Sequence, residues 1–203
     1  MTFKQTVLQE LLTLIRQEGL SHLNEHEIIN RVDISSATFR EFFKGGMEDV
    51  VTQVVEFDLD CRKKEHELLF AKEPSPLRRL LLVVEQGLTT LRMSQPTVLM
   101  EIQQKYPTAW ALYWAHSNEY SSYLLYDLLN QGVLQRELRQ DLNIQLVTKI
   151  MMEQLSMIVN PNTFPPDRFD VAEVFRSVFL YYIRGICTEE GMKKAEEFFA
   201  SMR

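Results

Sequence analysis

The sequence has few of the residues that cross-link a fold. Its only cysteines, Cys61 and Cys187, lie far apart and form no Cys-x-x-Cys pair. We therefore expect two thiols in a reducing compartment rather than a disulfide, because disulfide-stabilised domains are typical of secreted proteins. No internal repeat and no low-complexity segment interrupts the chain.

Long hydrophobic runs are also missing. The longest uncharged apolar run, residues 80–84, is far too short to span a bilayer. The first residues lack the charge, apolar run and small-residue cleavage site of a signal peptide. We expect a cytoplasmic protein with no membrane contact. Its 203 residues, 45% of them hydrophobic, allow one or two domains with a substantial core.

The motifs of common enzyme classes are absent. The sequence contains no Gly-x-Ser-x-Gly, no phosphate-binding loop and no dinucleotide fingerprint. His22 and His26 have the spacing of a helical metal pair, but His22 precedes the helix that Asn24 is expected to cap. His66, between two glutamates, is expected on the surface. We predict no enzyme activity, no cofactor and no metal site.

Positive charge is scarce. The formal net charge is −6, and residues 1–49 carry five basic and eight acidic side chains, a balance of −3. Arg31, Arg40 and Lys44 are the cations that could share one surface. Because phosphate contacts supply most of the affinity for nucleic acids, we expect weak and salt-sensitive non-specific binding.

Residues 33–43 are the most informative stretch. Ser35 is a favoured N-cap, and Phe39, Phe42 and Phe43 recur at helical spacing, which predicts one buried stripe. The opposite face is polar. Such a helix can present its N-terminal end to a partner, as the second helix of a helix-turn-helix presents its N-terminal residues to the major groove of DNA.

The preceding residues complete this motif. Asn24 and Glu27 have the spacing of an N-cap and its partner three residues on, and Ile28 begins an apolar run. Ile34 is expected to fill the turn. The sequence thus predicts a helix, a tight turn and a second helix within residues 24–43.

This pattern resembles the N-terminal region of the TetR family of bacterial regulators. The match covers about the first quarter of the chain, and overall length and helix order fit the rest. The matching residues are Val7, Leu8, Ile15, Gly19, Asn24, Ile28, Ile34, Ser35, Ala37, Thr38, Phe39, Phe42 and Phe43.

The resemblance implies a DNA-binding role for residues around the second helix. Ser36, Ala37 and Thr38, which follow the Ser35 cap, would face base edges of double-stranded DNA. The amide end of the helix that Asn24 caps, with Arg40 and Lys44, would hold phosphates. The family usually has Tyr where Arg40 stands and Lys where Met47 stands; Lys44 could replace the latter.

The rest of the chain also reads as helical. No stretch shows the sustained period-two alternation of strands, so the predicted fold is all-α. We predict a helix-turn-helix DNA-binding domain at residues 1–49 and a helical effector-binding and dimerisation domain at residues 50–203. The predicted helices cover residues 3–18, 47–71, 77–94, 97–105 (between Pro96 and Pro107), 108–130 (ended by Gly132), 143–159, 171–187 and 189–201.

Two of these helices carry more apolar surface than one face requires. A helix apolar nearly all round is either central or part of an interface. The resemblance favours a two-fold interface of a homodimer, with packing inside one protomer as the alternative. The predicted interface residues are Leu146, Ile150, Leu155, Val174, Val178, Phe179 and Tyr182.

The aromatic helix at 108–130 suggests a small-molecule pocket. Apolar walls with a few polar groups are typical of such pockets, although plain core packing of large side chains is the alternative reading. The effector itself is unknown. The predicted lining residues are Met100, Gln103, Trp110, Tyr113, Trp114, Tyr120 and Tyr123.

The resemblance to the TetR family implies a ligand-responsive DNA-binding regulator, a repressor that a small molecule releases from a palindromic operator. One alternative is a dimeric interaction protein of the same fold that has lost specific DNA binding. Another is an enzyme that uses the aromatic cavity, with His116 as its only histidine.

Overall fold

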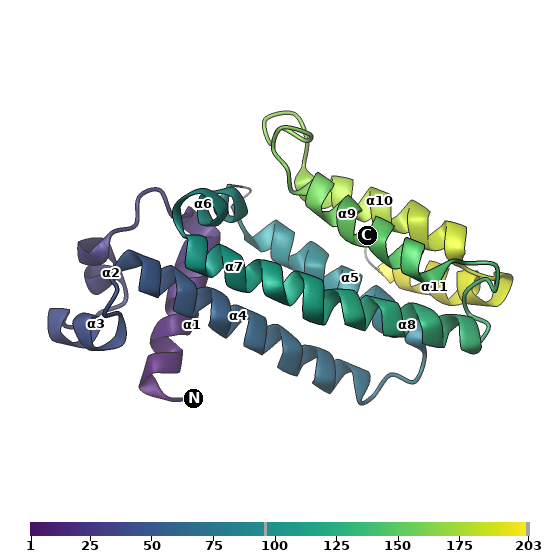
Figure 1. Cartoon of the computed structure of the whole chain (residues 1–203), viewed down its shortest axis with the longest axis horizontal. Helices are drawn as coiled ribbons and strands as arrows, with labels where there is room; N and C mark the ends of the chain where they lie inside the picture. Colours follow the sequence, from purple (N-terminus) through teal and green to yellow (C-terminus); the bar gives the residue numbers. More distant parts are fainter. Residues whose placement is uncertain (96, 202–203) are drawn as a thin grey trace. The chain divides into compact units, whose positions relative to one another are not determined.

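The computed structural model describes residues 1–95 and 97–201, so Pro96 lies outside the described residues (Figure 1). Its described part is all-α, with one isolated antiparallel bridge between Leu138 and Cys187. The helices are α1 (Phe3–Glu18), α2 (Glu25–Arg31), α3 (Ser36–Phe42), α4 (Met47–Phe70), α5 (Pro76–Met93), α6 (Val98–Lys105), α7 (Pro107–His116), the π-helix η1 (Ser117–Ser121), α8 (Ser122–Leu134), α9 (Ile144–Ile158), α10 (Val171–Ile186) and α11 (Glu189–Ser201).

The chain forms two compact units. The first contains Met1–Lys64 and Met93–His116, and the second contains Glu65–Arg92 and the chain from Ser117 onward. The predicted boundary between residues 49 and 50 separates two functions rather than two compact units, and it stays a prediction. Among the described residues, no helix is both long and apolar enough to cross a membrane.

The first unit is organised around the three N-terminal helices. Thr2 and Gln5 form a reciprocal capping box at the start of α1, which fixes where this helix begins. Leu11, Ile28, Phe39 and Val50, one from each of the first four helices, are fully buried in a common cluster. Burial of one apolar stripe per helix therefore holds α1, α2 and α3 against the start of α4.

The long aromatic helix predicted at residues 108–130 is not continuous. The structure divides it into α7, the π-turn η1 and α8, and α8 runs past Gly132 to Leu134. Gly132 lies inside α8, and the side chain of Leu138 packs so closely on it that a Cβ there would lie 2.8 Å from Leu138 Cδ1; the close approach, rather than a helix end, accounts for this glycine. The prediction that Gly132 ends the helix was therefore wrong.

The prediction of a solvated His66 was also wrong. His66 is 7% exposed, and its ring stacks on the rings of Phe70 and Tyr120 at centroid distances of 5.5 and 5.9 Å. Its Nδ1 lies 3.0 Å from the hydroxyl of Tyr120, a residue of the π-turn. The flanking glutamates suggested a surface residue, but the third and fourth neighbours along a helix decide which face is buried.

A buried carboxylate connects three segments of the second unit. Glu137 accepts hydrogen bonds from the Ser75 hydroxyl and the Leu77 amide, both at 2.9 Å, and pairs with Lys194 at 2.7 Å. Burial alone raises the pKa of Glu137, but the bonds from Lys194, Leu77 and Ser75 outweigh it and hold the pKa below its ordinary value. The start of α5, the chain after α8 and α11 thus meet at one ionised group.

We predict that Glu137→Gln lowers the unfolding free energy at pH 7 by about 2–3 kcal/mol, because Lys194 loses a buried partner. Because the pKa of Glu137 is lower in the folded protein than its ordinary value of 4.5, the ionised carboxylate stabilises the fold above pH 4.5. This contribution disappears as the pH falls through the folded-state pKa. Urea unfolding at pH 7 and below pH 4.5 should therefore show a difference that shrinks in acid. Glu196→Gln, at an exposed position on α11, is the control; a pH-independent difference would contradict this assignment.

Candidate nucleic-acid interface

The N-terminal end of α3 is held by a local cap. The Ser35 hydroxyl accepts a hydrogen bond from the Thr38 amide at 3.0 Å, as the sequence predicted. The hydroxyls of Ser35 and Thr38 are also within hydrogen-bond distance of each other, at 2.8 Å. Thr38 is half-buried as a result, whereas Ser36 and Ala37 are exposed.

The other side of α3 is anchored in the core of the first unit. Phe39 and Phe43 are each 1% exposed, and their ring centroids lie 5.3 Å apart. Phe42 is only half-buried, so the predicted stripe is confirmed at two of its three positions. This anchoring leaves Ser36, Ala37 and Arg40 on the free face of the helix.

The turn between α2 and α3 uses an uncommon backbone geometry. Asp33 has φ of 50°, in the left-handed region that glycine usually occupies at the end of a helix. The Ile34 amide donates to the Ile29 carbonyl at 3.2 Å, which closes the end of α2. Ile34 is buried in the turn, as predicted. These contacts fix the angle at which α3 leaves α2.

The start of α1 lies beside the end of α3. The rings of Phe3 and Phe42 are 5.9 Å apart, and the Lys4 ammonium lies 5.7 Å from the centre of the Phe42 ring. The sequence analysis missed this contact. The exposed aromatic Phe3 beside a lysine was the only local signal, and it did not indicate a partner more than thirty residues away.

The cations near α3 differ in what they contact. Arg31, predicted to share a surface with Arg40, is held by two hydrogen bonds to the carboxylate of Glu18. This pairing with Arg31 lowers the pKa of Glu18 and raises that of Arg31. Arg16 pairs with Asp58 at 2.6 Å. Arg40 and Lys44, in contrast, are exposed on or just after α3.

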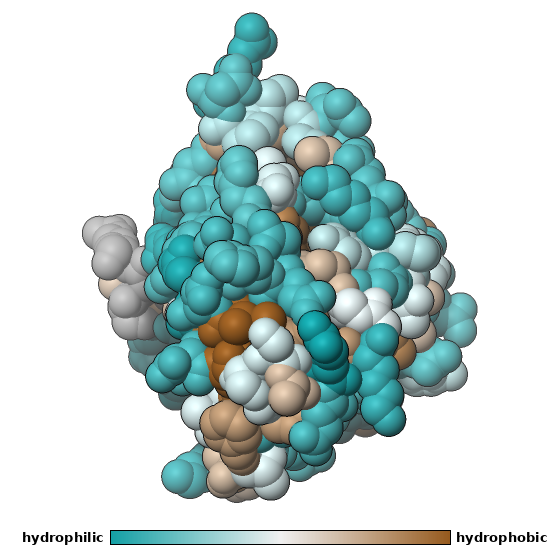
Figure 2. Space-filling view, turned by 90° about the vertical axis from the view of Figure 1, so that its left-hand side faces the viewer, coloured by the Kyte–Doolittle hydropathy of each residue, from teal (hydrophilic) through white to brown (hydrophobic). Residues whose placement is uncertain are grey.

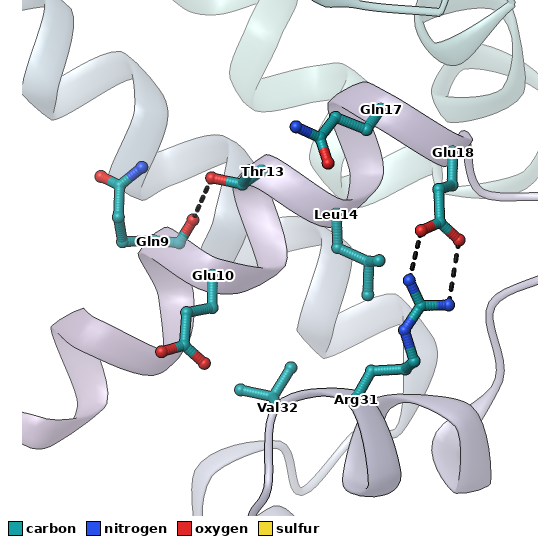
Figure 3. Close-up of a pocket in the computed structure, with 8 residues that line it drawn as sticks. All are labelled: Gln9, Glu10, Thr13, Leu14, Gln17, Glu18, Arg31 and Val32. Carbon is teal, nitrogen blue, oxygen red and sulfur yellow. Dashed lines mark hydrogen bonds and ion pairs between the residues drawn. The ribbon is translucent and has the colours of Figure 1, made fainter.

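A shallow hollow of about 280 Å³ lies next to the Glu18–Arg31 pair (Figure 3). Its wall is one face of α1 together with the last residues before the turn between α2 and α3. The lining residues are Gln9, Glu10, Thr13, Leu14, Gln17, Glu18, Arg31 and Val32. Figure 2, which views the side where Figure 1 draws α2 and α3, shows a mostly hydrophilic surface with one apolar area.

Asn24 acts as predicted at the start of α2, where its side chain accepts from the Glu27 amide at 3.0 Å. His26 lies within hydrogen-bond distance of the Asn30 side chain, at 3.1 Å. Among the described residues, no group of three His, Cys, Asp or Glu side chains is placed to hold a metal ion.

The predicted pocket residues are divided between the two units. In the first unit, Trp110 stacks with Tyr113 and Trp114 at centroid distances of 5.7 and 6.2 Å. Burial raises the pKa of the Tyr113 hydroxyl, whereas Trp114 is 53% exposed. Met100 is half-buried and Gln103 is exposed on α6. The predicted pocket residues of the first unit therefore include both core and surface residues.

The remaining two predicted pocket residues belong to the second unit. Tyr120 contacts His66, and burial raises the pKa of its hydroxyl. Tyr123 is 75% exposed on α8. The pocket as a whole stays a prediction.

The predicted interface residues lie on α9 and α10, which pack side by side (Figure 1). Leu146 is 55% exposed and Ile150 37%. Phe179 differs because it is buried in the core of the second unit, with its ring centroid 4.5 Å from that of Phe175. The half-buried members are Leu155, Val174, Val178 and Tyr182.

Solved structures with the same fold are transcription regulators. A TetR regulator from Haloarcula marismortui superposes with a TM-score of 0.72 at 16% identity, covering 91% of this chain and 98% of that one. The reduced form of NemR from E. coli gives 0.68 at 14%, covering 91% and 97%. A gamma-butyrolactone receptor gives 0.62 at 14%, covering 97% and 95%.

No family model and no curated protein matches the sequence. At these identities the structural likeness establishes the fold, which is that of the TetR-type regulators along almost the whole chain.

The left-handed turn residue gives a direct test of the geometry that aims α3. We predict that Asp33→Ala lowers the unfolding free energy by about 1–2 kcal/mol, because Ala lacks the short polar side chain that lets Asp adopt this left-handed φ. Asp33→Asn should stay close to the wild type, since Asn tolerates this region. Urea unfolding of the three proteins measures both effects. Equal stability of the Ala and Asn variants would show that the turn is not strained.

Proposed function

We propose that the protein is a cytoplasmic, dimeric, ligand-responsive DNA-binding regulator of the TetR type, most simply a repressor. The observation that carries this proposal is α3 itself. Its aromatic side is fixed in the core by Phe39 and Phe43, and its capped N-terminal end leaves Ser36 and Ala37 exposed. A helix held in this way suits insertion into a major groove.

The exposed residues divide into base-reading and phosphate-binding roles. Ser36 and Ala37, which are exposed, would meet base edges, and Thr38, whose hydroxyl lies against Ser35, would contribute mainly its methyl group. The exposed side chains of Arg40 and Lys44 would hold phosphates. Lys4, which lies over the Phe42 ring beside α3, is a third cation for the same backbone.

Dimerisation through α9 and α10 would supply the second recognition helix. Leu146 and Ile150 expose apolar side chains on α9, and Val174 and Val178 are half-buried on α10. Covering them with a symmetry-related copy would bury this apolar surface. Two copies of α3 would then occupy half-sites about one duplex turn, ~34 Å, apart on a palindromic operator.

A small apolar or amphipathic molecule is the proposed effector. The gamma-butyrolactone receptor, which has the same fold, is named for such a molecule. Within the first unit, the stacked rings of Trp110, Tyr113 and Trp114 on α7 supply candidate contacts. To release DNA, the effector must bind more tightly to a conformer that fits the operator poorly.

A second candidate function is an interaction protein that keeps the fold without specific DNA binding. The acidic balance of residues 1–49 and the engagement of Arg31 with Glu18 favour it. The two functions differ in an observable way, because an interaction protein would select no DNA sequence.

Selection from a randomised duplex pool at low salt tests the proposal. A DNA-binding regulator of this geometry enriches a palindrome whose half-sites are centred about ten base pairs apart. Failure to enrich any sequence would favour the interaction protein. Enrichment of a single half-site alone would contradict the dimeric arrangement.

We predict different effects for two variants on the selected duplex. Arg40→Ala should weaken binding to all duplexes alike and reduce the salt slope by about two per dimer, because each copy loses one phosphate contact. Ser36→Ala should leave the slope unchanged and alter base preference. Fluorescence anisotropy over a salt series measures both, with Arg168→Ala, in the loop before α10, as the control. The reverse pattern would contradict these roles.

A further inference from the structure

The C-terminal end of α1 is capped by a segment almost eighty residues away. The last carbonyls of a helix have no partner within the helix. The Arg16 carbonyl accepts from the Gln95 amide at 2.7 Å, and the Gln17 carbonyl accepts from the Gln95 side chain at 2.9 Å. All three residues belong to the first unit. Gln95 thus closes α1 from the chain that leads into α6.

A buried carboxylate on α6 holds the next residues. Glu101 is 8% exposed, and its Oε2 accepts from the Leu20 amide at 3.0 Å. Its Oε1 accepts from the Thr97 hydroxyl at 2.9 Å. Charged groups are seldom buried unless their hydrogen bonds are satisfied, and both partners of Glu101 are neutral. The two hydrogen bonds offset part of the cost of burying this side chain, and the bond from the Leu20 amide fixes the loop after α1.

The loop that Glu101 holds leads directly into α2. It begins at Gly19, whose φ of +81° turns the chain, and a Cβ at Gly19 would lie 3.6 Å from Glu101 Oε1. Leu20 is fully buried in the same core as Ile28 and Phe39. The position of Leu20 therefore affects where α2 and α3 lie.

The same end of α1 is also tied to α4. The Arg16 guanidinium pairs with Asp58 while the Arg16 carbonyl accepts from Gln95. Glu48, in the first turn of α4, accepts from the Thr108 amide near the start of α7 at 2.9 Å. Within the first unit, α1, α4, α6 and α7 are therefore joined by specific polar contacts beside the helix-turn-helix.

We propose that Glu101 and Gln95 are positioning residues for DNA binding. They hold the end of α1 and the following loop, and through Leu20 they set the placement of α3. Neither residue lies on the free face of α3, so their effect on affinity is indirect. This inference rests on the proposed DNA-binding function, and it assigns to Glu101 of α6 and to Gln95 before it a part in placing the recognition helix.

The experiment compares the variants Glu101→Leu and Glu101→Gln with a control, Gln104→Leu. Gln104 is an exposed residue of the same helix. On the selected duplex, Glu101→Leu should lose at least about tenfold in specific affinity while non-specific affinity and salt slope stay unchanged. Glu101→Gln should restore binding, because its amide oxygen can still accept from Leu20. Gln104→Leu should bind as the wild type. Hydrogen exchange of the Leu20 amide should accelerate only in the Leu variant.

Gln95→Ala provides a second variant in case Glu101→Leu does not fold. It removes the side-chain bond to Gln17 and keeps the main-chain bond to Arg16, and a loss of about threefold in specific affinity is expected. Unchanged specific affinity in Gln95→Ala and in any folded Glu101→Leu would overturn the inference and leave the proposed function intact. A wild-type protein that binds no duplex would instead overturn the proposed function, and the inference with it.

Discussion

Burial of Phe39 and Phe43 is the constraint on which the functional reading of this molecule depends. These rings occupy the core that α1, α2 and α4 share, so α3 has only one face left to expose. The Ser35 cap and the left-handed Asp33 then determine where that face begins and how it is aimed. Without the aromatic anchor, the exposed polar residues would have no fixed direction.

The positive charge available around α3 depends on which basic side chains form ion pairs, as well as on the net charge. Arg16 and Arg31 serve internal contacts with Asp58 and Glu18, which leaves Lys4, Arg40 and Lys44 near α3. A surface with few available cations gives weak non-specific attraction, so any strong binding must come from base contacts and from two heads acting together. This arrangement would favour selectivity over general affinity for DNA.

Local sequence signals predicted much of the fold. The bounds of α1 and α11 and the caps at Asn24 and Ser35 agree with the structure, because capping depends on neighbours within four residues. The π-turn was missed, as were the burial of His66 and the packing of Leu138 on Gly132. Glu101, a lone carboxylate among apolar residues of α6, could have been noticed, but its partner Leu20 is 81 positions away. Tertiary contacts of this kind leave no local pattern.

The most direct test of the account is the salt dependence of wild-type binding to the duplex selected from a random pool. Three available cations on each of two heads predict a slope of log K against log salt of about −5. That slope, with preference over a scrambled duplex, would support DNA recognition by α3 and its neighbours. Absence of binding at low salt, or a slope steeper than about −8, would contradict it, because the phosphate contacts would then be missing or would lie elsewhere.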